Sequence, residues 1–449
     1  MDQAAQWLRA GFRRPLTLAA VIAVLAAGAW ALSQPAIQLA ASCAGGGYGG
    51  TGYGGYGAPT GTCGPYVPLP PTRILDTRNG TGGVTGPVGP GQTVSIQVAG
   101  TAGVPASGAS AVVLNVTVTD PSEASYLTVY PQGTALPLAS NLNFALGETV
   151  ANLVEVQLGP SGGVSFFNQL GQIQLVADLE GYVSTTANGN AGLFTSVTPA
   201  RLLDTRIGLG GVTGPVKPGQ TVRVQVTGVG GIPSSGVGAV AFNLTATDSA
   251  GPSFITAYPD SQARPLASNL NFTNGETIAN RVIVPVVDGY VDLFNDFAGS
   301  DTQLVLDVNG YFTSSGAASP TGSDFNSQPP QRIVDTRPGS GLGYAGQTLG
   351  PGGVLTVQVA GFGGVPSMTS SSPPSAVVLN VTVTDASQPS YLTVWPSNVG
   401  QPGTSDVNFV PGESQPNFVV VGLSPTGQVS FYNQLGNADI VVDVEGWYS

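Results

Sequence analysis

The chain has 449 residues, of which 65 are glycine and 36 are proline, and this content of turn-forming residues excludes a mainly helical protein. Only 8% of the residues are charged and 41% are hydrophobic, unlike a disordered acidic tail. The chain has no histidine and only two cysteines, which excludes imidazole-dependent catalysis and zinc modules. Its 13 basic against 25 acidic residues exclude nucleic-acid binding.

The first 33 residues have the pattern of an export segment. Residues 1–14 form a basic flank with Arg9, Arg13 and Arg14, and residues 15–33 contain no charge. We expect a retained transmembrane anchor with the basic flank in the cytoplasm, because basic residues before an apolar run favour that orientation. A cleaved signal peptide is the alternative. In both cases the rest of the chain lies outside the cell, on the membrane or secreted.

Residues 34–70 are predicted to be a spacer, rich in glycine and tyrosine first and in proline at its end. The only two cysteines, Cys43 and Cys63, lie at either end of the glycine-rich part. In an oxidising exterior they can form one disulfide. An intermolecular bridge and lipidation of Cys43 are the alternatives.

Three copies of one unit fill the remainder. The hexapeptides RILDTR, RLLDTR and RIVDTR begin the copies, and DLEGYV, DVNGYF and DVEGWY end them, with further matched blocks in the same order between. The copies span residues 71–184, 199–313 and 329–449, joined by linkers at 185–198 and 314–328. Each is long enough to have its own core.

Within a copy the apolar residues alternate with polar ones, as in Leu114-Asn115-Val116-Thr117, which predicts half-buried strands separated by glycine- and proline-rich turns. About eight such strands fit in each copy. The expected fold is therefore all-β: three tandem antiparallel β-sandwich domains behind one N-terminal transmembrane or signal helix. A barrel is the alternative.

The start motif RLLDTR and the end motif DVxGYF resemble those of a bacterial cell-surface repeat family of actinobacterial and Chloroflexi type. The resemblance covers residues 71–449. It implies an envelope or extracellular location and an attachment role. In that family the repeats also accompany exported enzymes, and no such enzyme module is recognisable in this chain.

Six of the twelve arginines lie in the three start motifs, around a shared aspartate. We expect structural Arg–Asp clusters, because an arginine fork binds a carboxylate through two parallel hydrogen bonds. Anion binding is the alternative. The clusters consist of Arg73, Asp76 and Arg78; Arg201, Asp204 and Arg206; and Arg332, Asp335 and Arg337.

One strand of each copy predicts a candidate binding face. If the Leu and Val residues of YLTVYP, FITAYP and YLTVWP face the core, a row of aromatic rings faces outward and can stack on sugars or on another subunit. Burial of this face under a loop is the alternative. The six rings are Tyr126, Tyr130, Phe254, Tyr258, Tyr391 and Trp395.

Other recurrent polar residues are expected to be structural. Carboxylate pairs such as Asp178 and Glu180 lie two apart on one strand face. Two sets of recurrent amides are interpreted as turn or bulge residues: Asn143, Asn271 and Asn408, and Asn152, Asn280 and Asn417.

The sequence thus predicts a membrane-tethered surface protein that is not an enzyme and needs no cofactor or metal. It is expected to act as a structural or adhesion module through contacts with other envelope proteins or with itself. Binding of cell-wall glycan is the alternative function, and no nucleic-acid partner is expected.

Overall fold

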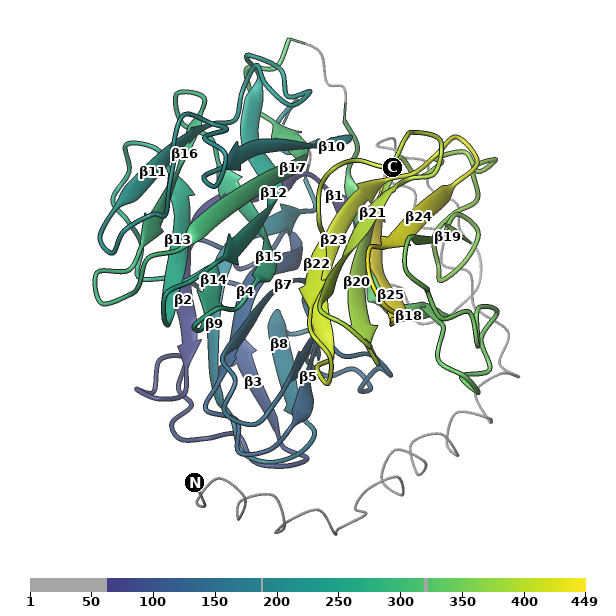
Figure 1. Ribbon diagram of the computed structural model, residues 1–449, viewed down its shortest axis with the longest axis horizontal. Coiled ribbons are helices and arrows are strands. Elements are labelled where there is room, and N and C mark those ends of the chain that lie inside the picture. Colours follow the sequence, from purple (N-terminus) through teal and green to yellow (C-terminus); the bar gives the residue numbers. More distant parts are fainter. Residues whose placement is uncertain (1–62, 187–188, 319–321) are drawn as a thin grey trace, which may run out of the picture. The chain divides into compact units, whose positions relative to one another are not determined.

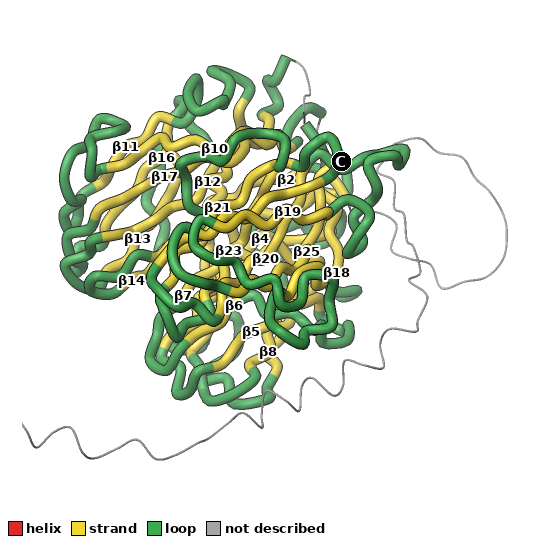
Figure 2. The backbone as a smooth tube through the Cα atoms, turned by 45° about the vertical axis from the view of Figure 1, so that its right-hand side comes forward, coloured by secondary structure: helices red, strands yellow, loops and turns green. Residues whose placement is uncertain are grey.

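The computed structural model describes residues 63–186, 189–318 and 322–449. This part of the chain consists of strands, turns and loops without a helix (Figure 2), so the all-β prediction is confirmed there. The basic flank 1–14, the apolar run 15–33 and Cys43 lie outside the described residues. Cys63 is buried, and its pairing with Cys43 stays a prediction.

Each copy forms two four-stranded antiparallel sheets, which we call inner and outer (Figure 1). The inner sheets, in strand order, are β2 (Tyr66–Asp76), β9 (Gln174–Ser184), β4 (Ala109–Thr119) and β7 (Val150–Gln157); β10 (Phe194–Asp204), β17 (Gln303–Thr313), β12 (Val237–Thr247) and β15 (Ile278–Pro285); and β18 (Phe325–Asp335), β25 (Asp439–Tyr448), β20 (Ala376–Thr384) and β23 (Gln415–Gly422). The short strand β1 (Cys63–Gly64) pairs with β18 and so joins the inner sheet of copy 3.

The outer sheets have the same order in each copy. They consist of β3 (Thr93–Gln97), β8 (Gly163–Asn168), β5 (Ser125–Pro131) and β6 (Leu142–Phe144); β11 (Thr221–Gln225), β16 (Tyr290–Asn295), β13 (Ser253–Pro259) and β14 (Leu270–Phe272); and β19 (Gly353–Gln358), β24 (Gln428–Asn433), β21 (Ser390–Pro396) and β22 (Val407–Phe409).

Side-chain alternation on the inner strands explains how the core is divided. On β4, Val112, Leu114 and Val116 belong to the core shared with the outer sheet. The intervening Ala111 and Val113 belong to a second cluster, to which the inner sheets of all three copies contribute. Because successive side chains of a strand point to opposite faces, the inner sheets are buried on both sides.

This central cluster joins the three copies. It contains five aromatic rings in tilted or edge-to-face contact, with the centroids of Phe194 of β10 and Tyr448 of β25 only 4.4 Å apart. Elsewhere, Ala111, Ala239 and Ala376 occupy the same position in the three copies. Strands β7, β15 and β23 all contact one another. The copies therefore form one compact unit with a shared core.

The prediction of three tandem β-sandwich domains is wrong, and so is the barrel alternative. The strands form six small separate sheets, as in a six-bladed β-propeller, and the copies are not successive independent domains because their inner sheets share the central cluster. The alternating pattern predicts that the apolar side chains of a strand face the core and that its polar side chains face water. In the structure the polar face of β4 is also buried: Asn115 and Thr117 lie between copies.

Strand starts also differ from the prediction. The proline-rich end of the predicted spacer forms the first half of β2, and the ends of both predicted linkers form the starts of β10 and β18. Proline lacks a donor for the ladder, and the prolines of β2 lie where its pairing with β9 shifts register, between Pro68 and Thr72. The irregularity accommodates them within the strand.

Candidate functional site

The start motif forms an ion-pair network in every copy. In copy 1, Arg73 of β2 lies opposite Asp178 of β9, the aspartate of the end motif. Its Nε and Nη2 donate to the two oxygens of Asp178 at 2.9 and 3.1 Å, and its Nη1 donates to Asp76 at 3.3 Å. Arg78 donates to both oxygens of Asp76, at 2.9 and 2.7 Å. The two motifs at the ends of each copy thus meet on adjacent strands.

The same arrangement recurs in the other copies. Arg201 binds Asp307, and Arg332 binds Asp443, each through two hydrogen bonds of 2.8 to 3.0 Å. Arg206 and Arg337 bind Asp204 and Asp335 as Arg78 binds Asp76. The sequence predicted the clusters within each start motif, and the structure adds a further carboxylate from the neighbouring strand.

Electrostatics favours the ionised form of Asp76 and Asp204. The hydrogen bonds from Arg78 lower the pKa of Asp76 below its ordinary value, and Arg206 lowers the pKa of Asp204 in the same way. The guanidinium groups are partly exposed, with side-chain exposure from 24% to 47%. Those of copies 1 and 2 line clefts between copies.

Six asparagines of the inner strands connect the copies, and Asn115, Asn243 and Asn380 lie directly opposite the aspartates of the end motifs in their sheets. At the junction of copies 1 and 2, Asn115 Nδ2 donates to the Ser268 carbonyl at 2.6 Å, and Asn280 Nδ2 donates to Asn115 Oδ1 at 2.9 Å. Asn280 Oδ1 accepts from the Leu153 amide at 3.1 Å. These amides therefore bind backbone groups and each other across the junction.

The pattern closes in a ring. Asn243 and Asn417 repeat it between copies 2 and 3, and Asn380 and Asn152 repeat it between copies 3 and 1. The interpretation of Asn152, Asn280 and Asn417 as turn or bulge residues is therefore wrong. Their recurrence at one strand position was the sequence signal, but nothing local showed that their partners belong to another copy.

A second polar contact makes the three junctions unequal. Asn269 Nδ2 donates to Glu180 at 3.1 Å between copies 1 and 2, and Asn141 Nδ2 donates to Glu445 at 3.4 Å between copies 3 and 1. Between copies 2 and 3, an arginine is added: Arg281 Nη2 donates to Asp406 at 2.8 Å, and Arg281 also binds Asn309. A buried Arg–Asp ion pair thus takes the place of the Asn–Glu contact of the other two junctions.

The buried carboxyl groups at these junctions differ from those of the start motifs. Burial, reinforced by Asp178, raises the pKa of Glu180 well above its ordinary value, and burial does the same for Glu155. Burial lowers the pKa of Arg281, while Asp406 favours its charged form. Burial therefore favours the neutral form of the Glu180 carboxyl group, while Arg281 and Asp406 form an ion pair.

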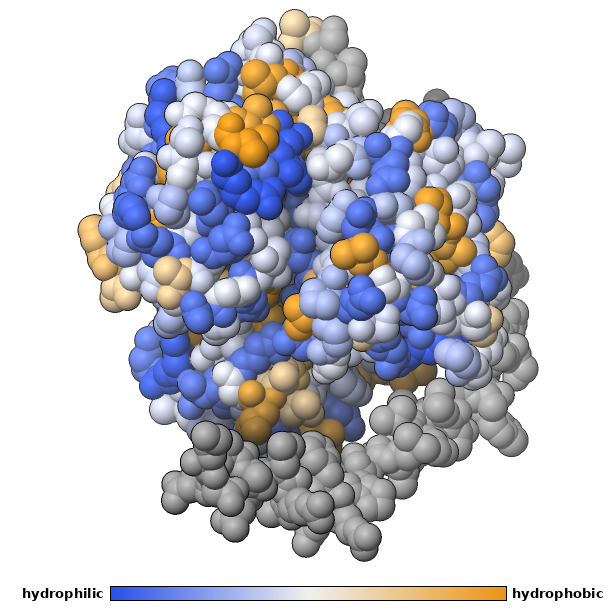
Figure 3. Space-filling model, in the orientation of Figure 1, coloured by the Kyte–Doolittle hydropathy of each residue, from blue (hydrophilic) through white to orange (hydrophobic). Residues whose placement is uncertain are grey.

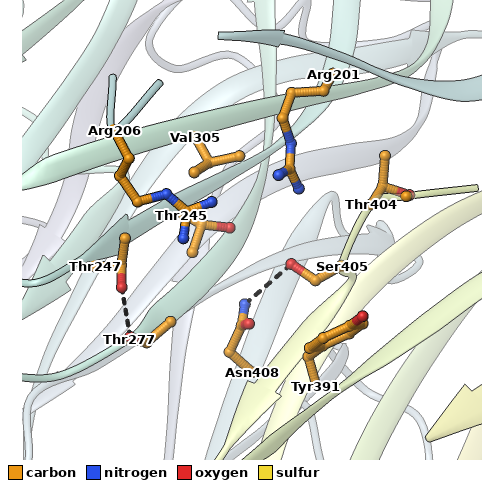
Figure 4. A pocket seen from close by; sticks show the side chains of 11 residues that line it. Arg201, Arg206, Thr245, Thr247, Thr277, Val305, Tyr391, Thr404, Ser405 and Asn408 are labelled. Carbon is orange, nitrogen blue, oxygen red and sulfur yellow. Dashed lines mark hydrogen bonds between the residues drawn. The ribbon is translucent and has the colours of Figure 1, made fainter. Parts of the chain in front are cut away.

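Clefts lie beside the start-motif networks at two junctions. The larger, about 160 Å³, lies between copies 2 and 3 (Figure 4). Copy 2 supplies Arg201, Arg206 and Thr245, and copy 3 supplies Tyr391, Gly403, Thr404, Ser405 and Asn408. The other, of about 70 Å³, lies between copies 1 and 2 and is lined by Arg73, Arg78, Thr117 and Asn271 among others.

Polar atoms without partners gather in both clefts. Within the described residues, Thr245 Oγ1 and Thr404 Oγ1 of the larger cleft form no hydrogen bond, although each residue is only 4% exposed. The same holds for Thr117 Oγ1 and Asn271 Nδ2 in the smaller cleft. An unsatisfied buried donor or acceptor costs about 1–3 kcal/mol, so such a concentration marks the clefts as the candidate functional site.

The predicted aromatic face is not an exposed row. Tyr130, Tyr258 and Trp395 are only 8%, 6% and 5% exposed, so the prediction of a binding face is wrong for these three rings. Tyr126, Phe254 and Tyr391 are half-buried. The loop after β5 covers this face, because Thr128 Oγ1 donates to the Ala139 carbonyl at 2.6 Å and Asn141 Oδ1 accepts from the Val129 amide at 2.7 Å.

Residues 63–186, 189–318 and 322–449 contain no helix that is long and apolar enough to cross a membrane. In the same ranges no three acidic or cysteine side chains converge in a way that would hold a metal ion.

No protein-family model matches the chain, and no curated protein matches it. Two solved structures align with it, described as "The Triple Jelly Roll Fold and Turret Assembly in an Archaeal Virus" and "Life in the extremes: atomic structure of Sulfolobus Turreted Icosahedral Virus". Their sequences are 9% and 11% identical to this one; each alignment covers 85% of this chain and 90% of the other. The TM-score is 0.19 for both, too low to assign a fold or a function.

Proposed function

We propose that the chain is a non-enzymatic attachment module of the cell surface, tethered by its N-terminal segment and acting through contacts with other envelope proteins or with itself. The proposal is supported by the structural role of the recurrent polar residues, which hold strands and copies together. The Arg–Asp networks and the six asparagines connect strands and copies, so they build a scaffold of three joined copies.

The surface supports protein contacts. On the face shown in Figure 3, apolar residues form small separate patches among polar ones. One exposed apolar residue recurs at the same position in each copy, in the turn after β8, β16 and β24: Leu170, Phe297 and Leu435, with exposures of 45%, 71% and 48%. A repeated exposed apolar side chain gives three similar contact points on one scaffold.

Substituting serine for Leu170, Phe297 and Leu435 tests this proposal. The protein should remain accessible to an external protease on intact cells but lose its crosslinks to envelope components. A matched control carries serine at Leu138 and Leu266, which are exposed without recurring in copy 3. Unchanged crosslinking of the triple variant, or protection of the wild-type protein from external protease, would contradict the proposal.

Carbohydrate binding is the second candidate function. The observation that favours it is the pair of clefts in which buried polar groups have no hydrogen-bond partner among the described residues.

A further inference from the structure

We propose that the cleft between copies 2 and 3 binds a sugar residue. The inference rests on the carbohydrate-binding alternative above and names its site. The cleft is about 160 Å³ in volume and is formed by side chains of two copies (Figure 4). It therefore exists only because the copies pack against each other.

Among the described residues of this cleft, two threonine hydroxyls are free to bind a ligand. Thr245 and Thr404 come from opposite sides of the cleft, and both hydroxyls are buried without a partner in the described residues. Neighbouring Thr247 is satisfied by Thr277, at 2.7 Å, so the lack of partners is specific. A hydroxyl both donates and accepts, and a ligand hydroxyl group satisfies both functions.

The arginines supply further donors. Arg201 uses its Nε, Nη1 and Nη2 on Asp307 and Asp204, and Arg206 uses its Nε and Nη2 on Asp204. A guanidinium has five N–H groups, so each arginine retains N–H groups for another oxygen. The two positive charges are already balanced by the two aspartates, which favours a neutral ligand over an anion.

Residue differences between copies make this cleft the larger one. Gly403 and Thr404 of copy 3 correspond to Leu266 and Ala267 of copy 2. A side chain at Gly403 would meet only open space, and the cleft beside copy 2 has less than half the volume. The half-buried ring of Tyr391 also lines the larger cleft, and aromatic rings stack on the apolar faces of sugars.

The test uses the full-length chain in a sugar-free detergent. Binding of glucose, galactose, mannose, N-acetylglucosamine and inorganic phosphate is measured by saturation-transfer NMR and titration calorimetry. The test variant combines Thr245→Val, which keeps the shape, with Thr404→Ala, the residue that copies 1 and 2 carry at this position. The control is Thr221→Val, at an exposed position on β11 of copy 2.

We expect at least one sugar to bind saturably and the double variant to bind it at least tenfold more weakly, while the control is unchanged. The melting temperature of the double variant should not fall, because the hydroxyls it removes form no hydrogen bond within the described part of the chain. The inference is overturned if no sugar binds, if the double variant binds as the wild type does, or if phosphate binds instead with the same dependence on these residues. Crosslinking through Leu170, Phe297 and Leu435 would be unaffected by any of these results.

Discussion

Asp406→Asn removes one negative charge from the junction of copies 2 and 3 and leaves its geometry in place. Asp406 Oδ1 accepts from Arg281, and its Oδ2 accepts from the Val394 amide at 2.7 Å. Asparagine keeps the second bond, since Asn141 and Asn269 accept from the matching amides in copies 1 and 2. The substitution therefore isolates the ion pair.

The expected loss is large because the pair is buried. The side chains of Arg281 and Asp406 are 0% and 2% exposed, and removing one member of such a pair leaves an uncompensated buried charge. This typically costs about 3–5 kcal/mol. The free energy of unfolding from urea denaturation measures the loss, provided that the dependence on denaturant is unchanged.

A compensating variant provides the control. Adding Arg281→Leu and Asn309→Glu to Asp406→Asn gives the junction of copies 2 and 3 the residues found between copies 1 and 2, where Leu153, Glu180 and Asn269 stand. We expect this triple variant to recover most of the stability. A loss below about 1 kcal/mol for Asp406→Asn alone would refute the reasoning, because it would show that Arg281 reaches water.

Three further predictions concern the other polar and aromatic groups. Asp204→Ala should lower the free energy of unfolding by about 1–2 kcal/mol, since its partners Arg201 and Arg206 are partly exposed and water screens them; an unchanged urea midpoint would contradict this. Trp395→Ala should cost about 3–5 kcal/mol because the ring is buried, and half-buried Tyr391 should cost less when replaced by alanine; equal losses would contradict the burial difference. Burial raises the pKa of Glu148 from 4.5 to about 7, so the folded chain binds more protons between those values and stability should fall as the pH rises through them; Glu148→Gln should flatten that slope.

The sequence was sufficient to predict strands and local pairings. Alternation gave the strands, and the placement of two arginines around one aspartate gave the ion-pair clusters, because both are set by residues close together in the chain or in one sheet. The partner Asp178 was noticed as half of a carboxylate pair with Glu180. Only the folded structure shows that Asp178 binds Arg73 on the neighbouring strand, whereas Glu180 binds Asn269 of the next copy.

The packing of the copies was not predictable in the same way. Asn115 and Thr117 alternate with valines, and such a pattern has the same appearance whether the polar side meets water or another copy. Two signals pointed to the second case: alanine at positions 111, 239 and 376, which allows close approach, and an asparagine repeated four residues later in each copy. Neither identifies the partner surface, because partners 127 to 266 residues apart are set by the folded chain as a whole.

Differential scanning calorimetry of the full-length chain tests most directly the claim that the copies form one unit. Copies that share a core and exchange buried hydrogen bonds must unfold together. We predict a single transition with a calorimetric enthalpy close to the van't Hoff enthalpy. Three separable transitions, or a calorimetric enthalpy about three times the van't Hoff value, would show that the copies unfold independently and would contradict the account.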